Sequence, residues 1–208
     1  MEYHCSMEPD LWAFEKKALD KGFSRIAGID EAGRGPLAGP VVSAAVILPP
    51  SQPDFPIIDS KKLTPKKRDV LYEKIYDFAL AIGIGIVDPA EIDRINILQA
   101  SLLSMAMSVE NLFPRPDCLL IDGIFRISSN IPQESIPKGD ALSTSIAAAS
   151  IVAKVTRDRM MERYDQDYPQ FGFSRHKGYP TKAHKAAIQK FGYCPIHRRS
   201  FKGVKEFV

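Results

Sequence analysis

The sequence predicts one α/β domain with a mixed central β-sheet flanked by helices. Two strand-like apolar runs stand near its beginning, and helical stripes then alternate with further apolar runs. With 208 residues, 45% of them apolar, the chain is long and apolar enough for a full core. This order of elements favours a layered domain over residues 1–170, completed by a small basic helical segment over residues 171–208.

The first elements are predicted to be a surface helix and a hairpin. An amphipathic helix is expected near Asp10–Lys21, with apolar side chains along one side. The runs Arg25–Asp30 and Val41–Leu48 are rich in strand-forming residues and are joined by the Gly/Pro-rich turn Glu31–Pro40. These runs predict two antiparallel strands.

Two helix-start signals in the middle of the chain predict two helices with a strand between them. Thr64 followed by proline predicts a helix over Pro65–Ala79, and an apolar run predicts a strand over Leu80–Val87. Asp88 then opens a capping box, which predicts one long helix reaching about Leu112.

A short apolar run then ends in an acid. Cys118–Asp122 is apolar up to its last residue, as a buried parallel strand would be. In open α/β sheets, ligands bind at the carboxyl ends of strands. Asp30 and Asp122 are both expected to project from such ends.

The last predicted helices lie beside most of the positive charge. Ser143 predicts the start of a helix to about Tyr164, and a short basic helix is expected over Thr181–Phe191. Residues 1–170 carry a net charge of −5, whereas residues 171–208 carry +8. A basic end beside an acidic body suggests a polyanionic ligand, with a solvated basic face as an equal alternative.

Composition excludes other classes of protein. No apolar stretch reaches the roughly 18 residues that a membrane span needs, and the first residues lack a signal-peptide pattern. Cys5, Cys118 and Cys194 lie far apart, so we expect free thiols in a reducing compartment. A cytoplasmic protein with no membrane contact is the expectation.

Three carboxylates form the strongest chemical signal. Asp30 and Glu31 follow one apolar run and Asp122 follows another, so a sheet would bring them to one edge. Carboxylates gathered in this way repel one another unless cations join them. An oxygen-only ligand set favours Mg²⁺ or Mn²⁺, and two such ions support phosphodiester hydrolysis. Solvated turn residues are the ordinary alternative for an isolated Asp-Glu pair.

The turn after these acids contains Gly33, Arg34 and Gly35. Its glycine spacing does not match a dinucleotide fingerprint, and no Gly-Lys-Ser/Thr closes it as in a P-loop. Glycines let main-chain groups approach a ligand closely, and an arginine can bind phosphate through two hydrogen bonds. The turn therefore predicts a phosphate contact, with a plain hairpin turn as the alternative.

Residues 29–42, Ile-Asp-Glu-Ala-Gly-Arg-Gly-Pro-Leu-Ala-Gly-Pro-Val-Val, resemble the signature of ribonuclease HII, the bacterial type 2 ribonuclease H. The resemblance extends over about residues 11–203, with the motifs in the order of that family. The further matching segments are Asp59–Leu63, Ile121–Gly123, Lys138–Asp140, Ala148–Asp158, His176–Thr181 and His197–Phe201.

The resemblance implies an RNase H-like fold and an endonuclease that hydrolyses the RNA strand of RNA–DNA hybrids and cuts 5′ to ribonucleotides embedded in duplex DNA. It implies two divalent ions, Mg²⁺ or Mn²⁺, on Asp30, Glu31, Asp122 and Asp140. Asp140 follows from the resemblance alone. Products would carry 3′-hydroxyl and 5′-phosphate ends, since the scattered histidines disfavour a metal-free route through the 2′-hydroxyl. The family is monomeric, and a sliding clamp stays open as a partner.

By the same resemblance, Gly33, Arg34 and Gly35 contact the 2′-hydroxyl at the cleavage site, and Tyr179 stacks on the next sugar. These residues would distinguish RNA from DNA. Asp158 is instead expected in a surface ion pair within Arg157-Asp158-Arg159. The expected phosphate contacts are Lys61, Lys62, Lys154, Lys177, Lys182, Lys185, Arg198 and Arg199.

Two other classes share parts of this pattern. A protein that binds hybrids without cutting them would keep the basic segment, but four acids would repel its substrate unless metal were present. A DNA-directed nuclease or recombinase of the same fold would keep the carboxylates. It would have no use for the Gly33-Arg34-Gly35 turn or for Tyr179.

Overall fold

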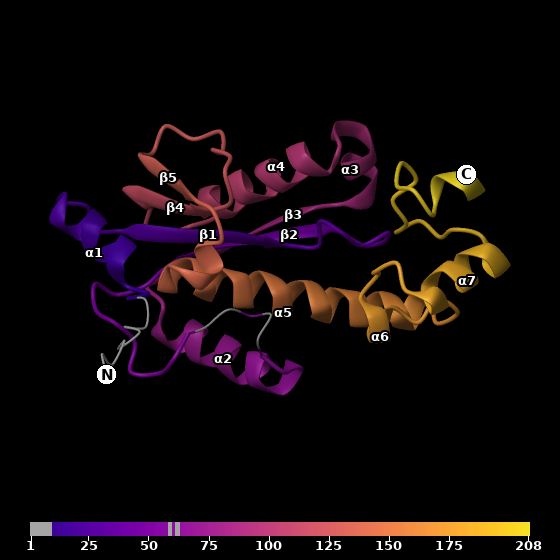
Figure 1. Cartoon of the computed structure of the whole chain (residues 1–208), viewed down its shortest axis with the longest axis horizontal. Helices are drawn as coiled ribbons and strands as arrows, with labels where there is room; N and C mark the ends of the chain where they lie inside the picture. Colours follow the sequence, from indigo (N-terminus) through magenta and orange to yellow (C-terminus); the bar gives the residue numbers. More distant parts are fainter. Residues whose placement is uncertain (1–9, 58–59, 61–62) are drawn as a thin grey trace, which may run out of the picture.

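A computed structural model describes residues 10–57, 60 and 63–208, and its centre is a single five-stranded sheet (Figure 1). The strand order is β3-β2-β1-β4-β5. The strands are β1 (Ile26–Ala32), β2 (Val41–Ile47), β3 (Ala81–Val87), β4 (Cys118–Asp122) and β5 (Gln133–Ile136).

The sheet is mixed, as predicted. β1 and β2 form the expected antiparallel hairpin, and β3 pairs antiparallel with β2. β4 runs parallel to β1, and β5 runs parallel to β4. β5 was not predicted, because Gln133-Glu134-Ser135 is polar and only Ile136 of this strand is buried.

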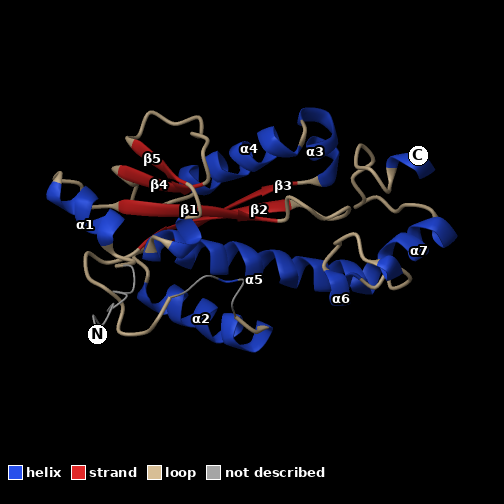
Figure 2. Cartoon of the chain, viewed as in Figure 1, coloured by secondary structure: helices blue, strands red, loops and turns tan. Residues whose placement is uncertain are grey.

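Helices cover both faces of the sheet (Figure 2). Ala44 and Val46 of β2 pack in one apolar cluster with α2 and α5, whereas Ala45 and Ile47 pack in another with α4. This alternation follows from the two-residue period of a strand. The helices are α1 (Ala13–Asp20), α2 (Pro65–Phe78), α3 (Pro89–Ile95), α4 (Ile97–Glu110), α5 (Thr144–Asp167), α6 (Phe173–His176) and α7 (Lys182–Phe191), with short 3₁₀ turns η2 (Gly139–Ala141) and η3 (Lys205–Phe207).

The expected long helix from Asp88 to Leu112 is wrong, because the chain breaks it into α3 and α4 at Asn96. Asn96 has φ 69°, and its side chain accepts hydrogen bonds from the main-chain N–H groups of Leu98 and Gln99. Asparagine tolerates positive φ and caps helices well. The break is therefore a local property of this residue.

α5 lies directly against β1 because Gly28 has no side chain. A Cβ on Gly28 would overlap the main chain of Ser145, at the start of α5. Ser143 caps this helix by accepting a hydrogen bond from Ile146 N–H, as predicted. The close approach positions the buried side of α5 beside the strand that carries Asp30.

Residues after Phe171 form an apolar cluster with the loop that follows β1. Leu37 and Ala38 of that loop pack with Met161 of α5 and with Phe173 and Ile188 of the C-terminal segment. α6, α7 and the C-terminus lie together at one end of the molecule (Figure 1). Within the described residues, no helix has both the length and the apolarity required to cross a bilayer.

Candidate active site

A cavity of about 250 Å³ lies where β1 and β4 separate. It gathers three of the four predicted metal-site acids, the whole Gly33-Arg34-Gly35 turn and two further predicted substrate residues. The lining residues are Asp30, Glu31, Ala32, Gly33, Arg34, Gly35, Ser60, Arg68, Asp122, Ser150, Lys154, Arg157 and Tyr179.

Strand register brings the first acids together. Ile29 of β1 pairs with Ile121 of β4, so the next residues along these parallel strands, Asp30 and Asp122, follow at the same level. Asp122 ends β4 as predicted. Asp30 does not project from a strand end, since β1 continues through Ala32 and Asp30 is only 4% exposed.

Crowding makes these carboxyl groups weaker acids. Burial is the largest cause that raises the pKa of Asp30 well above its ordinary 3.8, followed by the charges of Glu31 and Asp122. A hydrogen bond from Ser150 opposes this rise. Burial also raises the pKa of Glu31, although its ion pair with Arg34 at 3.3 Å opposes the change. The cavity thus holds carboxyl groups that burial and mutual repulsion make harder to ionise.

Asp140 does not line this cavity. It is buried in η2, whose preceding residue Lys138 has φ 60°. The N–H of Gly139 donates to Asp122 Oδ1 at 2.6 Å, which ties this turn to the end of β4. The metal role of Asp140 stays a prediction.

Gly33 and Gly35 permit the fold of the turn beside these acids. Gly33 has φ 104°, and a Cβ there would overlap the guanidinium of Arg157. A Cβ on Gly35 would lie 3.6 Å from the ring of Tyr179. Tyr179, 43% exposed, therefore stands at the rim of the cavity opposite the turn.

Arg198 corrects one sequence prediction. It is fully buried, so it cannot reach a phosphate as expected. Its guanidinium donates to the main-chain carbonyls of Gly33, Arg34, Pro36 and Gly39 at 2.6–3.1 Å. Burial, and to a smaller extent the charge of the neighbouring Arg157, lowers its pKa to about 9. Arg198 therefore holds the Gly33-Arg34-Gly35 turn from behind.

The position of Arg157 corrects a second sequence prediction. It was expected at the surface beside Asp158, but it is 1% exposed and donates to the carbonyls of Ala38, Pro40 and Lys177. Burial lowers its pKa to about 10. Because arginine has five N–H donors in a rigid fork, one buried side chain can tie three chain segments together.

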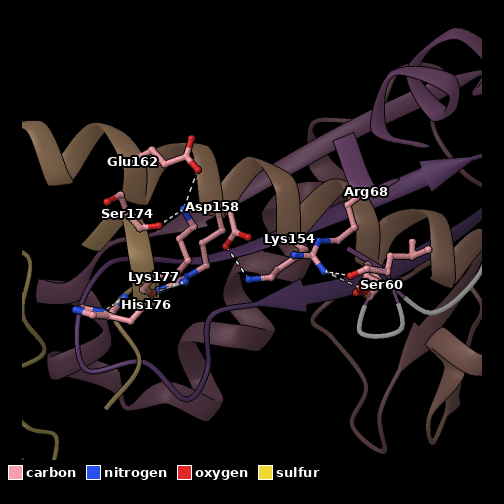
Figure 3. A network of polar contacts seen from close by, with 12 residues as sticks. Ser60, Arg68, Lys154, Asp158, Glu162, Ser174, His176 and Lys177 are labelled. Carbon is pink, nitrogen blue, oxygen red and sulfur yellow. Dashed lines mark hydrogen bonds and ion pairs between the residues drawn. The ribbon is translucent and has the colours of Figure 1, made fainter. Parts of the chain in front are cut away.

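The predicted lysines lie in different surroundings (Figure 3). Lys154 lines the cavity, and its Nζ lies 2.7 Å from Asp158 Oδ1. Lys177 does not line it; its Nζ bonds Glu162 and the carbonyl of Ser174, each at 2.7 Å. Asp158 does form an ion pair, but with the partly buried Lys154 and not with Arg157 or Arg159 as expected.

The other predicted phosphate contacts are less confined. Arg199 is exposed, and its guanidinium lies 5.0 Å from the ring centre of Tyr193. Lys182 and Lys185 are exposed on α7. Lys61 and Lys62 lie outside the described residues.

Sequence reasoning assigned no role to three residues that line the cavity. Ser60 and Ser150 share a hydrogen bond of 2.9 Å, and Arg68 of α2 donates to the carbonyl of Ser60 at 3.0 Å (Figure 3). Both serines stood inside the matching segments of the sequence, which was a usable signal. Arg68 had no such signal, because it lies just outside the matching segment Asp59–Leu63, among several other basic residues at the start of α2.

Comparison with known proteins agrees with this geometry. The family profile described as Ribonuclease HII matches residues 27–204. A Geobacter metallireducens protein named Ribonuclease HII is 58% identical over 97% of this chain and 94% of its own length. The crystal structure of ribonuclease H2 from Pyrococcus horikoshii is 29% identical, with a TM-score of 0.75 over 88% of this chain and 96% of that one.

A second solved structure, the PCNA:RNase HII complex from Archaeoglobus fulgidus, is 25% identical over 86% of this chain and 95% of that one, with a TM-score of 0.70. These neighbours confirm the RNase H-like fold, and the chain belongs to the ribonuclease HII family, the type 2 ribonucleases H that cleave the RNA of RNA–DNA hybrids.

Proposed function

We propose that this ribonuclease HII also cuts 5′ to single ribonucleotides embedded in duplex DNA, as an enzyme of ribonucleotide excision. Asp30, Glu31, Asp122 and Asp140 would hold two divalent ions. The observation that carries the proposal is one cavity with three crowded carboxylates, whose rim is formed by the glycine turn and Tyr179.

The donor chemistry fits Mg²⁺ or Mn²⁺. Asp30, Glu31 and Asp122 offer only oxygen, the ligand atom that hard cations prefer, and cations would relieve the repulsion that raises the pKa of Asp30. Among the described residues, no three Asp, Glu, His or Cys side chains stand as close together as the ligands of a bound ion. The fit therefore rests on the chemistry and the shared cavity. When bound, such ions supply an activated water and stabilise the leaving 3′-oxygen.

The chain itself supplies recognition. Only the Tyr179 ring lies within 4 Å of the place where Gly35 would carry a Cβ, and Arg34 is half exposed beside Glu31, so a sugar-phosphate backbone can reach the carboxylates. Tyr179 presents an exposed ring for stacking on the next sugar. A 2′-hydroxyl is the group that a site of this kind can use to distinguish RNA from DNA. Hydrolysis leaves 3′-hydroxyl and 5′-phosphate ends.

The substrate partner is a polyanion, an RNA–DNA hybrid or a duplex DNA with ribonucleotides. The segment 171–208, with a net charge of +8, would complete the substrate groove through Lys182, Lys185 and Arg199. We propose that the chain acts as a monomer. The PCNA complex of the Archaeoglobus protein makes a sliding clamp a partner to test here.

Asp122→Asn tests the carboxylate role. The amide keeps the shape of the side chain but removes a charged oxygen, so we expect cleavage with Mg²⁺ to fall at least about a thousandfold, since metal-assisted charge stabilisation contributes several kcal/mol. Circular dichroism and the unfolding temperature should stay near wild type. Asp77→Asn, an exposed acid of α2, is the matched control and should retain full activity. Substantial activity of Asp122→Asn would refute the assignment.

A further inference from the structure

Three imidazole rings form a compact group next to the main chain of Tyr179. His184 of α7 and His197 are 0% and 1% exposed, and their Nε2 atoms lie 3.0 Å apart. His176 of α6 stacks on His184 with ring centres 4.4 Å apart. None of these rings lines the carboxylate cavity, and the proposed hydrolysis does not use them.

The position of the proton on His197 is fixed by Cys194. The main-chain N–H of Cys194 points at His197 Nδ1 across 3.0 Å, and the Cys194 thiol lies 3.1 Å from the same atom. A main-chain N–H can only donate, so Nδ1 must accept. Neutral His197 therefore carries its proton on Nε2 and donates it toward His184.

The bond that His184 makes with Tyr179 independently gives the same direction for the hydrogen bond between His197 and His184. His184 Nδ1 lies 3.0 Å from the main-chain carbonyl oxygen of Tyr179, which can only accept. Neutral His184 therefore carries its proton on Nδ1, and its Nε2 is free to accept from His197. Each end alone selects the same pair of tautomers. The reverse direction would point two donors at each other at Cys194 and two acceptors at each other at Tyr179.

The buried surroundings of His184 and His197 favour the neutral form of both rings. Burial is the largest cause that lowers the pKa of both His184 and His197 to about 4. Burial also raises the pKa of the Cys194 thiol to about 11, so this group keeps its proton. His176 faces the same group and is fixed in its own way, accepting from Gly178 N–H at Nδ1 while its Nε2 lies 2.9 Å from the carbonyl of Phe171.

We propose that His184 and His197 are positioning residues for Tyr179. They form a one-way hydrogen-bond relay, Cys194 N–H to His197 to His184 to the Tyr179 carbonyl, which sets the place of the phenol ring at the rim of the cavity. This role rests on the proposed stacking of Tyr179 against the substrate.

The relay acts on the short piece of chain between α6 and α7. The Tyr179 carbonyl also accepts from Thr181 N–H at 2.8 Å, so both of its acceptor sites are occupied. Thr181 in turn caps α7 by accepting from His184 N–H at 3.2 Å. Loss of the imidazole would release one of the two bonds that hold this carbonyl, while the helix and its cap could remain.

The first test is structural and independent of activity. Long-range ¹H–¹⁵N spectra of the imidazole rings should show His184 as the Nδ1–H tautomer and His176 and His197 as Nε2–H tautomers. The shifts of His184 and His197 should not titrate between pH 5.5 and 8. An Nε2–H tautomer at His184, or a charged ring in that range, would overturn the relay.

The second test separates positioning from general packing. His184→Phe keeps an aromatic ring but removes the donor, whereas the amide of His184→Asn can still donate to the Tyr179 carbonyl. Ile188→Ala is the matched control, because Ile188 is buried on the same helix, packs in the apolar cluster that also holds Cys194, and contributes no hydrogen bond to the relay. All three variants should unfold at a lower temperature than wild type.

We expect His184→Phe to lower kcat at a single embedded ribonucleotide about tenfold, the effect of one lost hydrogen bond on the population of the active geometry. His184→Asn should retain most of that rate, and Ile188→Ala should match wild type well below its unfolding temperature. Equal losses in His184→Phe and Ile188→Ala, or no loss in His184→Phe, would overturn the positioning role.

Tyr179→Ala distinguishes this inference from the proposed function. If Tyr179 stacks on the substrate, Tyr179→Ala should lose at least as much activity as His184→Phe, and the double variant should lose little more. Full activity of Tyr179→Ala would refute stacking, and the positioning role with it, while the tautomer pattern would still be seen. Additive losses in the double variant would show that His184 acts on some other group and would contradict the proposal.

Discussion

At the scale of single residues, two buried arginines hold the Gly33-Arg34-Gly35 turn and the loop that follows it. Arg198 and Arg157 donate to main-chain carbonyls on both sides of Ala38, so each guanidinium replaces hydrogen bonds that regular secondary structure would otherwise supply. The sequence analysis predicted that Arg198 contacts substrate phosphates, because it lies in the positively charged segment 171–208. Charge alone does not report burial, and the carbonyls that bind it lie more than 150 positions earlier in the chain.

Arg198→Lys should therefore be a severe substitution despite keeping the charge. An ammonium has three donors on one atom and cannot span the carbonyls of Gly33 and Gly39, so buried acceptors lose their partners. We expect a loss of about 3 kcal/mol in unfolding free energy by urea titration.

The neighbour Arg199 provides the control for that change. Arg199→Lys replaces an exposed side chain and should stay within about 0.5 kcal/mol of wild type. Equal stability of the two variants would contradict the holding role of Arg198.

Asp30→Asn should change how stability depends on pH. The folded state raises the pKa of Asp30 above its ordinary 3.8, so the folded protein binds this proton more tightly than the unfolded chain does. Without metal, stability should therefore fall as pH rises from about 4 through the raised pKa. The amide cannot ionise, so that part of the fall should vanish.

The measurement is thermal unfolding in EDTA from pH 4 to 8. Asp30→Asn should be more stable than wild type at pH 7 and nearly equal to it at pH 4, where Asp30 is protonated. Mg²⁺ should raise the unfolding temperature of wild type and have less effect on the variant. A variant less stable than wild type at pH 7 would contradict the predicted crowding.

At the scale of elements, a helix or strand could be predicted when residues close together in the sequence determine it. Thr64 and Ser143 cap α2 and α5 as predicted, because a cap is made by residues three positions apart. Thr181, expected as the first residue of its helix, instead caps α7. β5 lacked such a signal, since it exists through pairing with β4. The break at Asn96 was visible as an asparagine but was outweighed by the continuous helical pattern around it.

Asn96 offers an element-scale prediction with a control at the same position. Asn96→Ala removes the cap of α4 and places a Cβ-bearing residue without local hydrogen bonds at φ 69°. We expect a loss of about 1–2 kcal/mol in unfolding free energy. Asn96→Gly removes the same cap but tolerates positive φ, so it should cost less. If glycine destabilises the protein more than alanine does, the account of this break is wrong.

At the scale of the whole molecule, one strand joins the separate parts. β1 carries Asp30 and Glu31, pairs with β4 and Asp122, and leads into the turn held by Arg198. The C-terminal segment packs on the loop after that turn and carries the Tyr179 relay. Sequence patterns indicated the acids and the turn, whereas their connection through buried arginines and histidines appears only when residues distant in the chain are placed together.

The most direct test uses a duplex DNA with one ribonucleotide, an all-DNA duplex of the same sequence, and reactions with Mg²⁺ or EDTA. We predict a single cut 5′ to the ribonucleotide, with 3′-hydroxyl and 5′-phosphate ends, in the Mg²⁺ reaction alone and no cut in the all-DNA duplex. Cleavage that persists in EDTA, or cleavage of the all-DNA duplex at a similar rate, would contradict the account.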